Sequence, residues 1–124
     1  METLYEVLGG EAVIRRLVDA FYDAMESDPA AVEIRAMHPT NLSSSRDKLF
    51  WFLSGWSGGP QLYVERFGHP RLRMRHARFP IGDAEAAAWM TCMHHALNEI
   101  IDDVELRGKL ADSFTGIAAH MRNQ

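Results

Sequence analysis

The chain has 124 residues, a length at which one domain with one hydrophobic core is expected, so we predict a single domain over residues 1–124. Its formal net charge of −4 argues against a nucleic-acid-binding protein, because that class usually has a strong basic excess on one face. The one cysteine, Cys92, cannot form an internal disulfide, and the sequence contains neither a signal-peptide pattern nor a membrane-spanning stretch. We therefore expect a cytoplasmic protein without a membrane or nucleic-acid partner.

Hydrophobic periodicity predicts an all-α fold, beginning with a helix from about Glu11 to Met25. Apolar residues recur there at three- and four-residue steps, which gives the helix one apolar face. The face comprises Val13, Ile14, Leu17, Val18, Phe21 and Met25. Tyr22 lies at its edge.

A second helix, of about ten residues, is predicted to begin with Ser44 and Asp47, which have the spacing of a capping box. The turn residues Gly58-Gly59-Pro60 end it. Its apolar residues are Leu49, Phe50, Phe52 and Leu53.

The two strongest periodic stretches lie at the end of the sequence and are separated by a break near Asp102-Asp103. We predict two long helices that pack as an antiparallel pair. The first stretch contains Trp89, Met93, Leu97 and Ile100, and the second contains Leu106, Leu110, Phe114, Ile117 and Met121.

The stretch between Gly55 and Ile81 has no sustained helical pattern, contains three prolines, and is basic although the whole chain is acidic. Long irregular stretches often carry function, and arginines can bind an anionic partner such as haem propionates, phosphate or RNA. A solvated loop is the alternative. The arginines are Arg66, Arg71, Arg73, Arg75 and Arg78.

Motifs along nearly the whole chain resemble those of the group II truncated haemoglobins, a family of small globins. The most specific is the run Gly68-His69-Pro70-Arg71-Leu72-Arg73-Met74-Arg75-His76. The others, in order, are Leu8-Gly9-Gly10, Phe21-Tyr22, His38-Pro39 with Leu42, Gly58-Gly59-Pro60, Trp89, and Cys92-Met93-His94. The resemblance implies a truncated globin fold, in which a two-over-two antiparallel helical sandwich surrounds haem b (iron protoporphyrin IX).

By this resemblance His76 matches the ligand that binds the haem iron, and neutral imidazole is well suited to that role. Tyr22 and Trp89 match the polar residues on the opposite side of the haem. Their O–H and N–H groups can donate hydrogen bonds to a bound diatomic ligand. Without the family pattern, a tyrosine and a tryptophan at core spacing would be interpreted as packing residues.

Three further residues are predicted on the ligand side of the haem. His38 lies where the family varies, and it either adds a third donor or leaves Tyr22 and Trp89 to act alone. Ser45 has a small side chain that opens a route from solvent, and Leu49 supplies an apolar wall.

Further haem contacts are expected from large side chains, each of which is also compatible with ordinary packing. The apolar candidates are Phe52, Trp56, Tyr63, Phe67, Leu72, Met74, Phe79 and Met93, and the propionate candidates are Arg71, Arg73 and Arg75. We expect the other histidines, His69, His94, His95 and His120, to be surface or packing residues.

Two functions follow from a bound haem. The first is reversible binding of dioxygen or another diatomic gas such as CO or NO, for storage, transport or sensing. The second is an enzymatic activity, nitric oxide dioxygenase or peroxidase-like, which would need an external reductase because the sequence contains no reductase domain. A third interpretation is a globin relative that has lost haem and binds a partner through its arginines. The sequence is compatible with a monomer or a homodimer.

Overall fold

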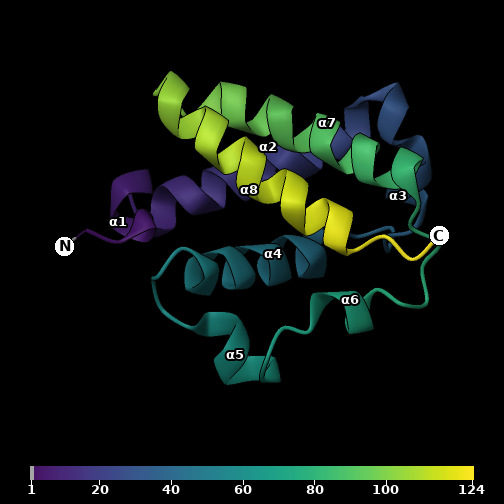
Figure 1. The fold of residues 1–124 in the computed structure, drawn as a ribbon, viewed down its shortest axis with the longest axis horizontal. Helices are drawn as coiled ribbons and strands as arrows, with labels where there is room; N and C mark the ends of the chain where they lie inside the picture. Colours follow the sequence, from purple (N-terminus) through teal and green to yellow (C-terminus); the bar gives the residue numbers. More distant parts are fainter. Residues whose placement is uncertain (1) are drawn as a thin grey trace.

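The computed structural model describes residues 2–124, and within this range all regular secondary structure is helical, with turns and irregular segments between the helices (Figure 1). This confirms the predicted all-α class. The elements are α1 (Leu4–Leu8), α2 (Glu11–Ser27), the 3₁₀ turn η1 (Pro29–Ala31), α3 (Val32–Ala36), α4 (Ser43–Trp56), α5 (Leu62–Phe67), α6 (Leu72–Arg75), α7 (Asp83–Ile100) and α8 (Val104–His120). None of the helices in this range is both long and apolar enough to cross a membrane.

The long helices form two antiparallel pairs, and this is the predicted two-over-two arrangement. Helices α7 and α8 run side by side in opposite directions, as predicted from their periodicity, and α2 and α4 form the second pair (Figure 1). The pairs are joined mainly through the packing of α2 against α7. The short helices α5 and α6 lie below α4 in the view of Figure 1, away from α7.

Helix α2 extends to Ser27, two residues beyond the predicted end at Met25. The apolar face is the predicted one, and its side chains at Ile14, Leu17, Val18 and Phe21 are almost completely buried. The chain leaves the helix at Asp28, whose carboxylate accepts a hydrogen bond from the Ala30 amide at 2.9 Å and so begins η1.

The predicted start of α4 is wrong in its details. The helix has 14 residues rather than about ten, begins at Ser43, and has no side-chain hydrogen bond from its N-cap residue Leu42. Ser44 and Asp47 form no capping box, because the Asp47 carboxylate instead pairs with Arg15 of α2 at 2.9 Å. The Asn41 side chain accepts a hydrogen bond from the Ser43 amide at 2.8 Å. The Asp47 carboxylate therefore forms an ion pair with another helix and not the helix cap that the sequence pattern predicted.

Residues 57–82 contain no long helix, in agreement with the sequence, but they do form two short helices. Neither α5 nor α6 contains a buried residue. Arg71, between them, has a φ of 43°, and it is the one non-glycine residue in the described range with a positive φ. Left-handed backbone is unfavourable for such a side chain and persists only where surrounding contacts impose it.

The core forms where α2, α7 and α8 meet, and it contains a group of aromatic rings. Phe21 of α2 lies 5.0 Å from Trp89 of α7 between ring centroids, and Phe114 of α8 lies 6.2 Å from the same tryptophan. On its other side Phe114 stacks on Trp56 of α4 at 5.1 Å. One residue from each of the four long helices thus takes part in the same cluster.

We predict that Leu97→Ala, in α7, lowers the free energy of unfolding by about 2–5 kcal/mol, because it leaves a cavity where a side chain is 2% exposed. Urea unfolding of the haem-free protein, followed by circular dichroism, measures the change. Val104→Ala is the matched control, since Val104 is 71% exposed and should change stability by no more than about 0.5 kcal/mol. Equal effects of the two substitutions would contradict the position of the core.

Candidate functional site

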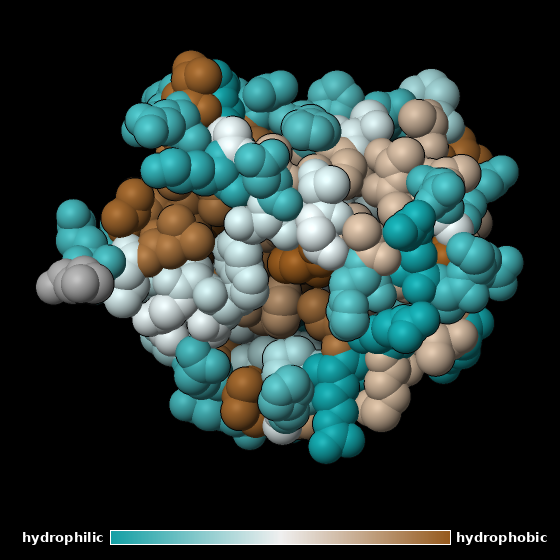
Figure 2. Space-filling view, in the orientation of Figure 1, coloured by the Kyte–Doolittle hydropathy of each residue, from teal (hydrophilic) through white to brown (hydrophobic). Residues whose placement is uncertain are grey.

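A cleft of about 520 Å³ lies between α4, α5, the 69–72 segment and the end of α8. Its lining is mainly aromatic and aliphatic, with a few polar groups at the rim. The lining residues are Phe52, Gly55, Trp56, Gln61, Tyr63, Val64, His69, Pro70, Arg71, Leu72 and His120. In Figure 2, hydrophobic side chains are recessed among polar ones in the middle of the face shown. Such a surface suits a flat, largely apolar molecule.

The structure brings five of the predicted haem contacts together in this cleft: Phe52, Trp56, Tyr63, Arg71 and Leu72. The other predicted contacts do not line it. Phe67 is 41% and Met74 58% exposed, Met93 is fully buried in α7, and Phe79 lies next to His76, with 6.4 Å between ring centroids.

Two histidines that the sequence analysis expected to be surface or packing residues, His69 and His120, also line the cleft. Both are exposed, as predicted, so their position in the fold is what brings them to the site. A signal for His120 was present in the sequence, because it continues the apolar stripe of α8 three residues after Ile117.

His76 directly follows α6, and its ring is oriented by that short helix. The Nδ1 atom lies 2.7 Å from the Leu72 carbonyl oxygen, one helical turn earlier. A carbonyl can only accept a hydrogen bond, so Nδ1 carries the proton and Nε2 keeps a lone pair. Burial of the half-buried ring lowers the pKa of His76, as does the nearby His38, although the Leu72 hydrogen bond opposes them. The neutral imidazole that results is the form that binds metals.

His38, just after α3, is held in the same way as His76. Its Nδ1 lies 2.8 Å from the Ile34 carbonyl oxygen, so the neutral ring presents an acceptor at Nε2. Of the two roles left open by the sequence, a third donor is thus available only from the protonated ring. The two imidazoles are close enough to interact electrostatically, because His38 contributes to lowering the pKa of His76.

Tyr22 is buried in α2 with only 6% exposure, between Phe21 at 5.0 Å and His38 at 5.8 Å between ring centroids. Burial raises the pKa of its phenol far above the ordinary value, and the nearby Arg46 lowers it only in part. The hydroxyl therefore stays protonated and available as a donor.

Neither the Tyr22 hydroxyl nor the Trp89 indole N–H is hydrogen bonded to any residue in the described range. Within that range, every completely buried side-chain nitrogen or oxygen has a partner. Both groups must therefore open onto space that a small molecule can reach. Two neighbouring donors that no protein acceptor uses are available to a bound ligand, which makes this pair of side chains the most informative feature of the site.

A row of aromatic contacts connects Tyr22 and Trp89 to the cleft. Phe21 contacts both side chains, Phe114 contacts Trp89, and Phe114 in turn stacks on Trp56 in the cleft wall. Ser45 and Leu49 lie one turn apart on α4, and both are half-buried. Neither His76 nor any of the predicted ligand-side residues lines the cleft itself. Tyr22 and Trp89 are connected to its wall through these rings, and Ser45 and Leu49 through α4.

The three predicted propionate partners differ in their surroundings. Arg75 donates hydrogen bonds from Nε to the Pro70 carbonyl at 2.7 Å and from Nη2 to the Phe67 carbonyl at 3.0 Å, so its guanidinium is already used to fold the loop. Arg71 lines the cleft, and neither Arg71 nor Arg73 has a hydrogen-bond or ion-pair partner in residues 2–124. The free guanidinium groups therefore belong to Arg71 and Arg73.

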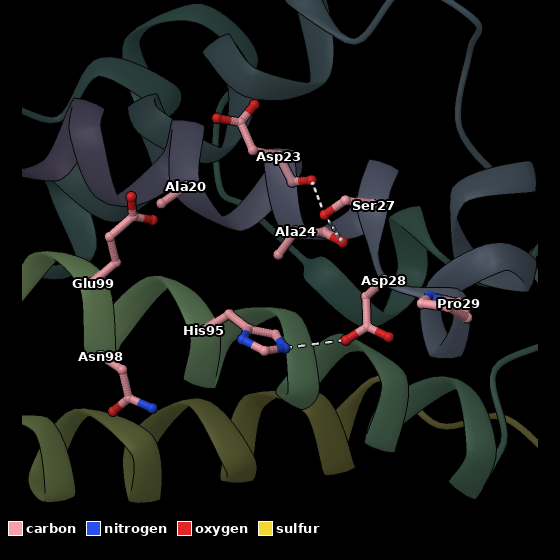
Figure 3. Close-up of a pocket in the computed structure, with 9 residues that line it drawn as sticks. All are labelled: Ala20, Asp23, Ala24, Ser27, Asp28, Pro29, His95, Asn98 and Glu99. Carbon is pink, nitrogen blue, oxygen red and sulfur yellow. Dashed lines mark hydrogen bonds and ion pairs between the residues drawn. The ribbon is translucent and has the colours of Figure 1, made fainter.

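A larger groove, of about 750 Å³, lies elsewhere, between the end of α2 and α7 (Figure 3). Its rim carries the carboxylates of Asp23, Asp28 and Glu99, and the His95 ring points at Asp28, with 3.1 Å between Nε2 and Oδ2. The amide of Ala30 and the same histidine lower the pKa of Asp28. The part of the chain that the structure describes contains no cluster of three or more potential ligands able to hold a metal ion. None of the predicted site residues lines this groove, so size alone does not identify the site.

Comparison with known proteins agrees with the geometry. The family model described as bacterial-like globin matches residues 3–123. A group 2 truncated haemoglobin of Bacillus subtilis, YjbI, is 38% identical over 120 residues, which cover 97% of this chain and 88% of that protein. The chain belongs to the group II truncated haemoglobins.

Solved structures of truncated haemoglobins have the same fold over the whole length. A cold-adapted truncated haemoglobin from the Antarctic bacterium Pseudoalteromonas haloplanktis TAC125 superimposes with a TM-score of 0.97 at 45% identity, covering 99% of each chain. A truncated oxygen-avid haemoglobin from Bacillus subtilis superimposes with a TM-score of 0.89 at 37% identity, covering 98% of this chain and all of that one.

Membership of the truncated haemoglobins implies a bound haem, and the residues present fit that group. The fit rests on observations of this chain: an aromatic and aliphatic cleft, a histidine whose Nε2 is free, and two donors that have no partner in the described residues. The guanidinium groups of Arg71 and Arg73 are suited to the two haem carboxylates.

We predict that the free energy of unfolding of this truncated haemoglobin, measured without haem, falls above about pH 10 because of Tyr22. The unfolded phenol loses its proton near its ordinary pKa of 10.0, whereas the buried phenol keeps it. The unfolded chain then binds fewer protons than the folded chain, so stability decreases as pH rises. Between pH 9 and 11 the wild type should lose about 1 kcal/mol more than Tyr22→Phe in urea unfolding. If the free energy of unfolding has the same pH dependence in the two proteins, the Tyr22 phenol is not buried as described.

Proposed function

We propose that residues 1–124 form a single globin domain that holds haem b and binds dioxygen or another diatomic gas reversibly. When bound, haem supplies an iron that can accept a small ligand such as dioxygen, CO or NO. The observation that carries the proposal is the pair of donors, on Tyr22 and Trp89, that open onto accessible space without a protein partner. A haem protein that holds a polar ligand would use such donors.

His76 is the proposed iron ligand, through its free Nε2. The hydrogen bond from Nδ1 to the Leu72 carbonyl fixes the tautomer and the orientation of the ring, and it increases the donor strength of Nε2. Burial also lowers the pKa of His76, so more of the ring is neutral near neutral pH and able to bind iron.

Tyr22 and Trp89 are the proposed hydrogen-bond donors to the bound gas. A diatomic ligand that gains partial negative charge accepts hydrogen bonds worth about 1–3 kcal/mol each, or roughly one to two factors of ten in its rate of escape. His38 packs edge-on against the Tyr22 ring, with 5.8 Å between ring centroids, and can hold that ring in place while its O–H stays available to the ligand. Ser45 leaves room for ligand entry, and Leu49 forms the apolar wall.

The proposed haem environment combines the cleft lining with the neighbouring loop. Phe52, Trp56, Tyr63 and Leu72 supply the apolar contacts in the cleft, and Arg71 with Arg73 binds the propionates. Arg75 contributes indirectly, by folding the loop that precedes α6. Phe67, Met74 and Phe79 complete the set as outer contacts, and Met93 contributes from the core, where it is fully buried.

Among similar proteins, the Bacillus subtilis truncated haemoglobin is described as oxygen-avid, and this supports dioxygen as the ligand to test first. Its similarity extends over nearly the whole of this chain.

We predict that His76→Gly loses the axial ligand of the haem, so that the variant binds haem weakly and its absorption spectrum changes. Added imidazole should restore the wild-type spectrum, because it can occupy the position of the missing ring. His69→Gly and His120→Gly are matched controls, since both histidines line the cleft and are not proposed ligands. The assignment fails if His76→Gly keeps the wild-type spectrum or if one of the control variants loses it.

We predict that Trp89→Phe speeds the escape of dioxygen about tenfold or more, because it removes the indole donor and keeps an aromatic ring in the core. Stopped-flow displacement of dioxygen by CO measures the rate. Tyr22→Phe and the double variant should be measured together with it, because donors that share one acceptor are not additive. An escape rate unchanged in the double variant would exclude both residues as donors.

A further inference from the structure

The segment that carries His76 has little support from the rest of the fold. Helix α6 has four residues, none of them buried, and it makes no extensive contact with another helix in the described range. A helix of this length is far too short to be stable by itself. Something other than core packing must therefore fix the position of the histidine.

Residues 122–124 supply that support. In Figure 1 the C-terminal end of the chain lies beside the loop that leads from α6 to α7. The amides of Asn123 and Gln124 both donate hydrogen bonds to the Ile81 carbonyl, at 2.8 and 3.2 Å. Arg122 also forms an ion pair with Asp83 in the first turn of α7. The end of the chain is thus attached to the loop and to the helix that follows it.

The Asn123 side chain extends this attachment toward His76. Its Oδ1 accepts a hydrogen bond from the Ile81 amide at 3.0 Å, and its Nδ2 donates to the Phe79 carbonyl at 2.8 Å. The same nitrogen makes a longer contact of 3.5 Å with the carbonyl oxygen of His76 itself. The orientation of the amide is determined, because only Oδ1 can accept from the Ile81 N–H.

The other end of the segment is held by Arg75, whose guanidinium binds the Pro70 and Phe67 carbonyls. Both side chains bind backbone carbonyls or amides of the loop. His76 therefore lies in a short stretch of backbone between two side-chain attachments. The attachment through Asn123 joins residues 42 to 47 positions apart in the sequence.

We propose that Asn123 is a positioning residue for His76: by holding the backbone from His76 to Ile81, it keeps the imidazole directed at the haem iron. This inference rests on the proposed role of His76 as the iron ligand. Loss of the Asn123 side chain removes its bonds to the Ile81 amide and the Phe79 carbonyl, while the main-chain bonds to the Ile81 carbonyl remain. The turn after the ligand is then loosened, so the imidazole samples other orientations and the iron–histidine bond is made in a wider range of geometries. Haem then escapes more readily.

The test compares Asn123→Ala with Asn98→Ala, a matched control on the exposed surface of α7 whose side chain makes no hydrogen bond in the described range. The haem-loaded proteins are mixed with an excess of a haem-scavenging apoglobin, and the rate of haem loss is recorded. The iron–histidine stretching band of the ferrous, ligand-free form is recorded by resonance Raman spectroscopy. Amide hydrogen exchange at Ile81 is followed in the haem-free proteins.

We expect Asn123→Ala to lose haem about fivefold faster than the wild type or more, with a shifted or broadened iron–histidine band and faster exchange at Ile81. Asn123→Asp should fall between them, because it keeps the acceptor for the Ile81 amide and loses the donor to Phe79. Asn98→Ala should match the wild type in all three measurements.

The proposal is overturned if Asn123→Ala equals Asn98→Ala in haem loss and in the Raman band, even when exchange at Ile81 is faster. That result would leave His76 as the iron ligand. Failure of the proposed function itself gives a different pattern, because the wild-type protein would then bind no haem or show no iron–histidine band.

Discussion

The packing of α2 against α7 is the interaction on which the rest of the structure depends. Phe21 and Trp89 meet across that interface with 5.0 Å between ring centroids, and Phe114 from α8 lies against the same tryptophan. Tyr22 follows Phe21 directly, so its phenol is fixed by the same helix packing. Because aromatic side chains in a close-packed core have few alternative positions, the two donor groups are held in place before any ligand arrives. Donors that are already oriented need no rearrangement when a ligand binds.

The side of the site that carries His76 is built differently. It has no buried residue in α6 and depends on hydrogen bonds from the Arg75 and Asn123 side chains to the backbone rather than on packing. The two donors are therefore held rigidly by core packing, whereas the imidazole is held by a few hydrogen bonds that can adjust more easily. A haem between the two would itself cover apolar side chains of the cleft and join α4 to α6, so haem binding and the folding of the 62–82 segment should be coupled. The acidic groove between α2 and α7 has no part in this arrangement.

The long helices could be predicted from the sequence because each buries a continuous apolar stripe, as at Ile14, Leu17 and Phe21 in α2. The start of α4 was predicted wrongly, since the carboxylate of Asp47 binds Arg15, which is 32 positions away. The family motif identified His76, Tyr22 and Trp89 as candidate site residues, because periodicity alone is equally consistent with packing roles. The attachment of Asn123 to the loop after His76 has no local signature at all, because its side chain and the loop backbone are brought together only by the complete fold.

The absorption spectrum of the purified protein, recorded as isolated, after reduction, and after addition of CO, tests the central claim most directly. The account predicts one haem per chain and a strong Soret band that shifts when CO is added, because the iron would be held on one side by a histidine and open to a small ligand on the other. A protein that shows no Soret band even after haem is supplied, or a band that does not respond to CO, would contradict it.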